Sequence, residues 1–331
     1  MSKFPKPENF KNHKTLPQKT LEEVFPYSNS YLFRNNIFPR KFKKCYIYDI
    51  LEQKFTDFFL DRGRYYLGFS DKYLTKMVKN YLKTSMFSYS KGVFSYRFTK
   101  LLKELTGNRF EHLLFAPSYE SLCGVIERFV GGELSDGVEV CGNRKGCCRL
   151  SLYDQNMALE LKNLEKVCGE VVVLDLGYGL RYPEVIKLLQ EIDFGLVILW
   201  VGRFFVILLR KEFISLIRDS DICGCELSEF DAMFGYYYLM RERFLVTKKL
   251  VELRKLSQRW LGKFVDLGIA TLLTPYSLQF NSSLLPEDFN LALLREGILS
   301  YGNTLFFSFQ HEENDFKRLR RKLNQIFGIG V

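Results

Sequence analysis

The sequence lacks any apolar run long enough to cross a lipid bilayer. Its longest run, Leu196 to Leu209, is interrupted by Gly202 and Arg203, whereas a membrane span needs roughly 20 apolar residues. Two buried strands account for this run better than a span does. No secretory signal opens the chain, so we expect a cytoplasmic protein.

Cysteine and histidine are too few and too scattered for a disulfide scaffold or a metal centre. The 331 residues include 8 cysteines and 3 histidines, and the histidines lie far apart. No catalytic triad can be recognised around them. The nearest approach to a metal cluster is made by five cysteines whose spacing fits no zinc pattern: Cys141, Cys147, Cys148, Cys223 and Cys225. We therefore expect reduced thiols and no metal site.

Positive charge is in excess but is not concentrated in one long segment. The formal net charge is +10, with clusters at Arg40–Lys44 and Lys317–Lys322. The second cluster lies on a helical pattern with apolar residues on the other face, which favours a solvated surface over a binding helix. An anion or nucleic-acid binder that uses Arg144, Lys145 and this basic helix stays an alternative, although nucleic acid is not the expected partner.

The chain is organised around residues 171–209. They read VVVLDL, then a helix-like YPEVIKLLQEI, then FGLVILWV and FFVILL. Unalternating runs of Val, Ile and Leu are typical of strands buried on both faces, and the helical pattern between the first two predicts a parallel crossover. Chemistry in such sheets is expected beyond the carboxyl ends of the strands, at Asp175–Arg181 and Trp200–Arg203.

Other elements follow from local patterns. Residues 1–30 hold four prolines and little periodicity, so they are expected to form an arm. The remaining patterns predict the following: a hairpin at Tyr46–Phe59, helices at Lys72–Thr84, Phe94–Leu105 and Glu120–Val130, and a short strand ending at Phe115–Ser118.

Several motifs occur in a recognisable order. The run CYIYDILEQKFTDFFLDRGRYYLGFS matches a hairpin followed by a glycine turn, through Tyr46, Asp49, Asp57, Gly63 and Gly68. The segments FTKLLKELTGNRFEHLLFAPSYESLCGVIERF, LYDQNMALELKNL, RKEFISLI, CGCELSEFDAMFGYYYLM and ALLREGILSYGNTLFFSFQHEENDFKRL continue it in the same order. From about residue 30 to its end, the chain resembles the class III aminotransferases, especially the glutamate-1-semialdehyde aminomutases.

This resemblance implies an α/β protein of the fold type I class, a dimer that holds pyridoxal phosphate. The expected architecture is a mostly parallel central sheet with helices on both faces, followed by a small C-terminal α+β domain. The expected domains are an arm at 1–30, a shortened large domain at 31–240 and a small domain at 241–331. The aromatic run Tyr236–Tyr238 is expected to pack in the core or between subunits rather than to stack on bases.

At the cofactor site that the resemblance implies, the chain departs from the family pattern. The phosphate segment aligns with Ser118 and Tyr119 after Pro117, which removes one amide donor. The ring-stacking segment aligns with Arg144 and Lys145, both basic.

The remaining cofactor positions also differ. The aspartate that pairs with the ring nitrogen aligns with Trp200, and Asp175 on the preceding strand is the alternative. No lysine lies between Trp200 and Arg210, and Lys211 is a weak candidate for the Schiff-base position. The threonine that reaches a neighbouring subunit aligns with Cys225.

Together these departures predict a catalytically degenerate aminotransferase-like protein with no bound cofactor. We expect a binding or regulatory subunit, as a homodimer or with an active paralogue. The alternative is an active pyridoxal-phosphate-dependent aminotransferase or aminomutase, with Lys211 or Lys187 beside Asp175.

Overall fold

The computed structural model describes twelve parts of the chain: residues 32, 37–60, 65–84, 92–116, 121–122, 147–151, 171–175, 196–202, 204–211, 227–274, 277–300 and 302–329. For residues 147–151 and 171–175 only the backbone is described. The chain forms two compact units, which we call the terminal unit (residues 1–71 with 251–331) and the central unit (residues 72–250).

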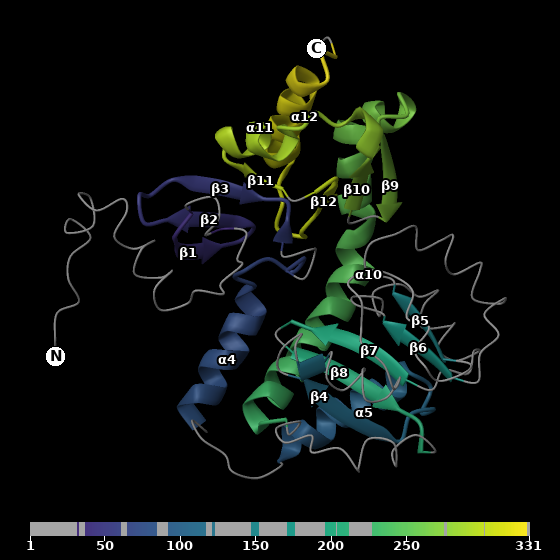
Figure 1. The fold of residues 1–331 in the computed structure, drawn as a ribbon. Coiled ribbons are helices and arrows are strands. Elements are labelled where there is room, and N and C mark those ends of the chain that lie inside the picture. Colours follow the sequence, from purple (N-terminus) through teal and green to yellow (C-terminus); the bar gives the residue numbers. More distant parts are fainter. Residues whose placement is uncertain are drawn as a thin grey trace, which may run out of the picture. The chain divides into compact units, whose positions relative to one another are not determined.

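The central unit contains a five-stranded sheet in the order β4-β8-β7-β6-β5 (Figure 1). Its strands are β4 (His112–Ala116), β5 (Cys147–Ser151), β6 (Val171–Asp175), β7 (Leu196–Val201) and β8 (Phe204–Leu209). β5, β6 and β7 are parallel, whereas β8 runs antiparallel to both β7 and β4. The parallel strands predicted within residues 171–201 are therefore confirmed, and the helix predicted between them lies outside the described residues.

β7 and β8 form the apolar centre of this sheet. Every residue of β8 is buried, and so are residues 197–201 of β7. Uninterrupted apolar side chains suit strands that are covered on both faces. This burial explains why the sequence shows no alternation here and why it cannot reveal the direction of a strand.

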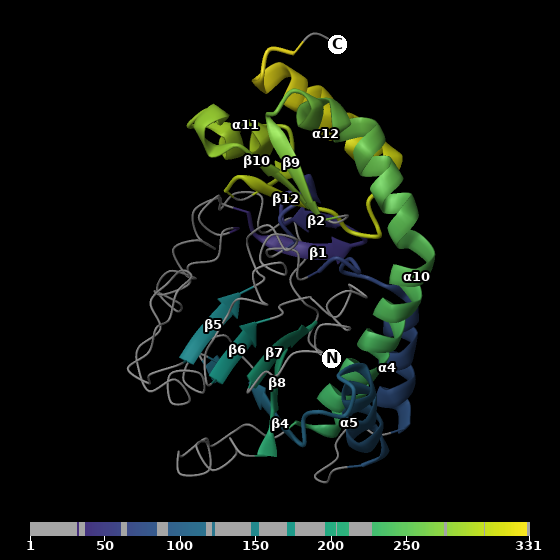
Figure 2. The same ribbon diagram turned by 90° about the vertical axis from the view of Figure 1, so that its right-hand side faces the viewer.

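Helices α4 (Lys72–Thr84), α5 (Val93–Leu105) and the start of α10 (Glu229–Asp266) complete the central unit. α5 lies beside the sheet (Figure 2). It contacts the sheet through Phe98, whose ring lies 6.2 Å from Phe115 and 5.9 Å from Phe204, centroid to centroid. Gly235 on α10 lets the helix approach, because a Cβ there would lie 2.8 Å from the Phe98 ring. The predicted helices at Lys72–Thr84 and Phe94–Leu105 are confirmed.

Glu229, the first residue of α10, ties this helix to α5. Its carboxylate accepts hydrogen bonds from the backbone N–H groups of Gly92 (2.9 Å) and Phe94 (2.7 Å). It also accepts from the backbone N–H (3.1 Å) and the hydroxyl (2.7 Å) of Ser95. These amides belong to the first turn of α5, where N–H groups have no partner within the helix and the dipole favours a negative charge. A residue 134 positions away in the chain thus caps the helix.

The tyrosine run 236–238 packs within the central unit. Tyr238 is buried, and the rings of Tyr236 and Tyr237 lie 6.3 and 5.6 Å from that of Phe94, centroid to centroid. Tyr237 also contacts Tyr73 on α4, at 6.0 Å. The interpretation of this run as packing residues is confirmed.

The terminal unit contains two small sheets (Figure 1). One has the order β1-β2-β3-β11, with β1 at Pro39–Lys43, β2 at Tyr46–Asp49, β3 at Lys54–Asp57 and β11 at Ile298–Leu299. The other has the order β12-β10-β9, with β9 at Ala270–Thr274, β10 at Ser277–Phe280 and β12 at Thr304–Phe306. The predicted hairpin at Tyr46–Phe59 is confirmed as β2 and β3.

Helices cover these sheets, and one strand pair joins the two ends of the chain. The short η5 spans Ser282–Leu284, α11 spans Phe289–Arg295 and α12 spans Glu313–Ile326. β3 pairs in parallel with β11, through Thr56 with Ile298 and Asp57 with Leu299. Strands near the N-terminus therefore share a sheet with a strand from the C-terminal segment.

The domain limits expected from the sequence stay a prediction. Residue 240, the expected boundary, lies inside the 38-residue helix α10, which continues from the central unit into the terminal unit. The expected arm at residues 1–30 lies outside the described residues. Among the described helices, none combines the length and the apolar character that a bilayer crossing requires.

Candidate functional site

The carboxyl edge of the central sheet is the first place to look for chemistry, because ligands bind there in open α/β sheets. Backbone register places the ends of several strands together at this edge. Phe205 on β8 pairs with Trp200 on one side and with Ala116 on the other. Two residues before Trp200 on β7, Ile198 pairs with Asp175 at the end of β6. Asp175 in turn pairs with Ser151 at the end of β5. Two predicted positions, Asp175 and Trp200, therefore lie at the ends of neighbouring strands.

At this edge Trp200 is part of the hydrophobic core. Its side chain is only 9% exposed, and its ring packs edge-on against Phe205 at 4.3 Å between centroids. A buried aromatic pair of this kind contributes packing energy and has no acid–base chemistry.

The turn that follows Trp200 is very tight. Val201 pairs with Phe204, so only residues 202 and 203 connect β7 to β8. Gly202 has a positive φ of 62°, and a Cβ there would lie 2.7 Å from the ring of Phe234. Such a backbone favours glycine on conformational grounds. β7 and β8 are therefore joined as a hairpin with a two-residue turn, and no crossover lies between them.

Lys211 lies at the opposite edge of the sheet. β8 runs antiparallel to β7, so its end at Leu209 pairs with Leu196, the first residue of β7. Ile207 pairs with Ile198, the partner of Asp175, and four further residues at about 3.3 Å each lead away from it to Lys211. Lys211 is exposed, and its backbone N–H donates to the Glu111 carboxylate at 2.9 Å. The antiparallel direction of β8 therefore separates Lys211 from Asp175.

The other predicted site residues are not among those that the structure describes. Ser118 and Tyr119 come two and three positions after Ala116, the end of β4. The remaining ones outside the described residues are Arg144, Lys145, Lys187 and Cys225. Their proposed roles stay predictions.

The terminal unit holds a buried polar network around His311. The Nδ1 atom of His311 accepts from the backbone N–H of Ser308 at 2.8 Å, and its Nε2 lies 3.0 Å from the carbonyl oxygen of Asp57. The ring stacks on Phe58 at 4.2 Å between centroids. Burial lowers the pKa of His311 from 6.5 to about 3, so the imidazole is neutral at physiological pH. Both ring nitrogens therefore contact backbone groups, and neither is available to transfer a proton.

Asp315 is another buried ionisable group of this unit. Its carboxylate accepts from the hydroxyl of Tyr46 at 3.0 and 3.1 Å and from the backbone N–H of Glu312 at 2.8 Å. Burial raises the pKa of Asp315, and it also raises the pKa values of the Tyr46 hydroxyl and the Cys45 thiol. A buried thiol with a raised pKa is a poor nucleophile.

Neither unit offers a metal centre among the residues described. No group of three or more His, Cys, Asp or Glu side chains is close enough there to hold an ion. Cys147 and Cys148 lie on β5, and the other three cysteines of the hypothetical cluster fall outside the described part of the chain. One feature could not be found from the sequence: the basic face of α12 borders a hollow, because Glu296, at the end of α11, lies against it.

Comparison with known proteins identifies the fold. No family model matches the sequence, and no curated protein matches it either. A solved structure described as a transaminase with PLP bound aligns with a TM-score of 0.70 at 12% identity, over 96% of this chain and 97% of that one. The chain has the fold of the aminotransferases.

Other transaminases align over similar lengths. The omega-transaminase from Sphaerobacter thermophilus gives a TM-score of 0.66 at 11% identity, over 88% of this chain and 91% of that one. The ornithine delta-aminotransferase from Plasmodium falciparum gives 0.61 at 13% identity, over 95% of this chain and 98% of that one. At these identities the likeness concerns the aminotransferase fold alone, because one fold can carry many functions.

Proposed function

We propose that this chain is a catalytically degenerate relative of the class III aminotransferases, closest in its motifs to the glutamate-1-semialdehyde aminomutases. It acts as a non-catalytic binding or regulatory subunit in the cytoplasm. The observation that carries this proposal is the hairpin between β7 and β8. It occupies the part of the sheet edge where the resemblance requires a lysine.

The described residues at the carboxyl edge fit pyridoxal phosphate poorly. When bound, this cofactor acts as an electron sink, and it needs a lysine amine for covalent attachment and an acid beside its ring nitrogen. Asp175 ends β6 at this edge and could supply the acid. Trp200 is committed to packing, and there is no lysine among the described residues of this edge. We therefore assign no catalytic step to the cofactor.

The test is a titration of the purified protein with pyridoxal phosphate, followed by absorbance. Borohydride reduction and peptide mapping then locate any attached cofactor. We expect no saturable absorbance band, and reduction spread over several exposed lysines. Lys211→Arg and Lys187→Arg variants should behave as the unsubstituted protein does.

The opposite result would restore the active enzyme. A saturable band that maps to one lysine, and that disappears when this lysine becomes arginine, would contradict the degenerate site. Asp175 gives this alternative its one structural support, because a carboxylate at a parallel strand end is what the ring nitrogen would need. If that lysine were Lys187, the crossover between β6 and β7 would carry the catalytic group.

The subunit role has a candidate contact surface on α10. Met240 and Phe244 lie four residues apart, hence on one face of the helix, and are 39% and 53% exposed. We propose that this face contacts a second copy of the chain or an active paralogue. Sedimentation velocity should show a dimer that Phe244→Glu dissociates, whereas Tyr96→Glu, at a 69% exposed position of α5, should leave it intact. A monomeric unsubstituted protein would contradict self-association.

A further inference from the structure

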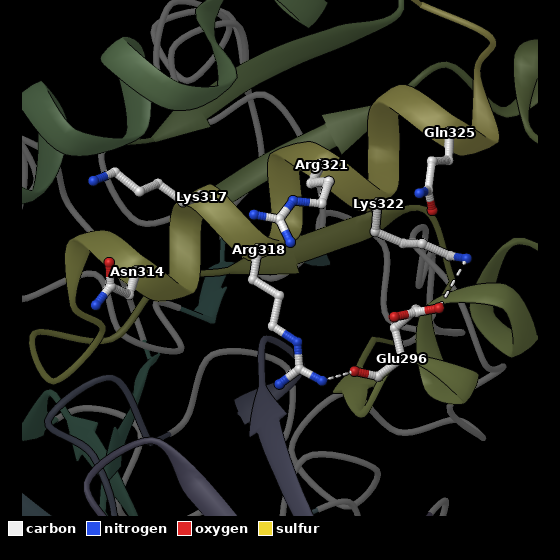
Figure 3. A pocket seen from close by; sticks show the side chains of 7 residues that line it. All are labelled: Glu296, Asn314, Lys317, Arg318, Arg321, Lys322 and Gln325. Atoms are coloured by element: carbon white, nitrogen blue, oxygen red, sulfur yellow. Dashed lines mark hydrogen bonds and ion pairs between the residues drawn. The ribbon is translucent and has the colours of Figure 1, made fainter. Parts of the chain in front are cut away.

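The terminal unit carries a basic hollow on α12 (Figure 3). Its volume is about 370 Å³, within the range of small-ligand sites. It is lined by Glu296, Asn314, Lys317, Arg318, Arg321, Lys322 and Gln325. Four cationic side chains and one carboxylate give this lining a formal charge of +3, from four positive charges and one negative.

The spacing of these cations places like charges next to each other on the helix. Lys317 and Arg321 are four residues apart, and so are Arg318 and Lys322. Like charges at this spacing destabilise a helix. A bound anion would remove this repulsion.

The helix has little freedom to relieve the repulsion by moving. Phe316, Leu319 and Leu323 on its other face are fully buried. A capping box formed by Glu312 and Asp315 fixes its start. The basic face is therefore held where it is by packing on the opposite side.

Contacts with the end of α11 also orient two of the four cations. The guanidinium of Arg318 donates to the backbone carbonyl of Glu296. The ammonium of Lys322 lies 3.4 Å from the Glu296 carboxylate, and this lysine side chain is only 19% exposed. Figure 3 shows Arg321 between them, and within the described residues it makes no hydrogen bond or ion pair.

We propose that this hollow binds a phosphate-bearing anion. Arginine presents a planar fork of donors that matches the oxygens of a phosphate, and lysine adds point charge. A ligand with two or more negative charges matches the lining charge of +3 better than a single carboxylate does. The site lies within the terminal unit and is independent of the function proposed for the sheet edge.

Tryptophan fluorescence offers a local readout. The chain has two tryptophans, Trp200 and Trp260. The ammonium of Lys317, part of the hollow, lies 5.1 Å from the centroid of the Trp260 ring. In a Trp200→Phe background, Trp260 is the sole emitter, and an anion that binds Lys317 should change its emission.

The experiment titrates this variant with inorganic pyrophosphate and with inorganic phosphate. Isothermal titration calorimetry serves as a second measure. We expect saturable binding, tighter for pyrophosphate by about tenfold, that weakens as salt is raised. Arg318→Gln combined with Arg321→Gln should weaken binding by at least about tenfold. The matched control is Arg254→Gln with Lys255→Gln, which removes the same charge from exposed positions of α10 outside the hollow, and it should change affinity less than twofold.

A second arm distinguishes a soluble ligand from a lipid headgroup. Vesicles that contain phosphatidic acid are sedimented with the protein, with and without the two arginine substitutions. Retention that depends on Arg318 and Arg321 without binding of pyrophosphate would assign the site to a headgroup. Absence of saturable binding in both arms, or equal losses in the control pair, would overturn the proposal.

Discussion

The two units bury ionisable side chains in opposite ways. The central unit buries Glu229, whose pKa is lowered although burial alone would raise it, because Ser95, Phe94 and Gly92 donate to its carboxylate. The terminal unit buries His311, which stays neutral. In both units the buried group holds the fold together, so neither is free for acid–base work. The hollow on α12, in contrast, presents charge that a ligand can meet.

The largest effect that would test this comparison comes from Glu229→Ala. The substitution leaves the first turn of α5 without its acceptor, and hydrogen bonds to charged groups contribute about 1.5–3 kcal/mol each. We expect the free energy of unfolding to fall by about 3 kcal/mol, since water can replace part of the loss. Urea unfolding, followed by the fluorescence of Trp200, measures this fall in the free energy of unfolding.

The matched control for this variant is Glu104→Ala. Glu104 is 55% exposed, and among the described residues its carboxylate forms an ion pair only with Lys100, at 3.9 Å. Its loss should cost less than about 0.5 kcal/mol. Equal losses for the two variants would show that Glu229 does not hold α5 to α10.

Two glycines of α10 sharpen the comparison further, because Gly235 faces packed aromatic rings in the central unit and Gly262 faces open space in the terminal unit. A Cβ at Gly235 would lie 2.8 Å from Phe98 and 2.9 Å from Phe204, whereas a Cβ at Gly262 would have no neighbour within 4 Å. Gly235→Ala should destabilise the protein by about 2 kcal/mol through overpacking. Gly262→Ala should stabilise it by about 0.5–1 kcal/mol, because alanine favours a helix.

Thermal unfolding of both variants shows whether their changes in stability have opposite signs. Trp200 reports on the central unit and Trp260 on the terminal unit. Changes of the same sign would mean that Gly235 and Gly262 do not differ in the space around them.

The third expected effect is the pH dependence due to His311. Its pKa is about 3 in the folded protein and ordinarily 6.5, so between these values the unfolded chain binds the extra proton. Stability should therefore fall as the pH drops below 6.5, by about 1.4 kcal/mol per pH unit. Urea unfolding between pH 7 and pH 5, followed through Trp260, measures the slope. His311→Gln should flatten it, and an unchanged slope would assign the dependence to other groups.

The sequence predicts those helices and strands that short stretches of residues determine by themselves. The hairpin at Tyr46–Phe59 and the helices at Lys72–Thr84 and Phe94–Leu105 follow from periodicity and turn residues. The apolar runs of the sheet predicted buried strands for the same reason. Within these limits the sequence and the structure agree.

The features that the sequence missed depend on partners far away along the chain. Nothing near α5 indicates that Glu229 caps it. The direction of β8 cannot be known from a strand buried on both faces, so the edge on which Lys211 lies could not be predicted. The apolar residues on the other face of α12 favour a solvated basic face. Glu296, which borders the hollow, precedes Lys317 by 21 residues, so the local pattern cannot reveal it.

The pairing of β3 with β11 has a consequence for synthesis of the protein. Lys54–Asp57 leave the ribosome long before Ile298 and Leu299 have been made. Until then, β3 presents an open row of backbone donors and acceptors, which other chains can pair with. Contacts this distant in sequence also slow folding. The terminal unit can complete this sheet only after Ile298 and Leu299 have been made, so the early strands are open to aggregation until then.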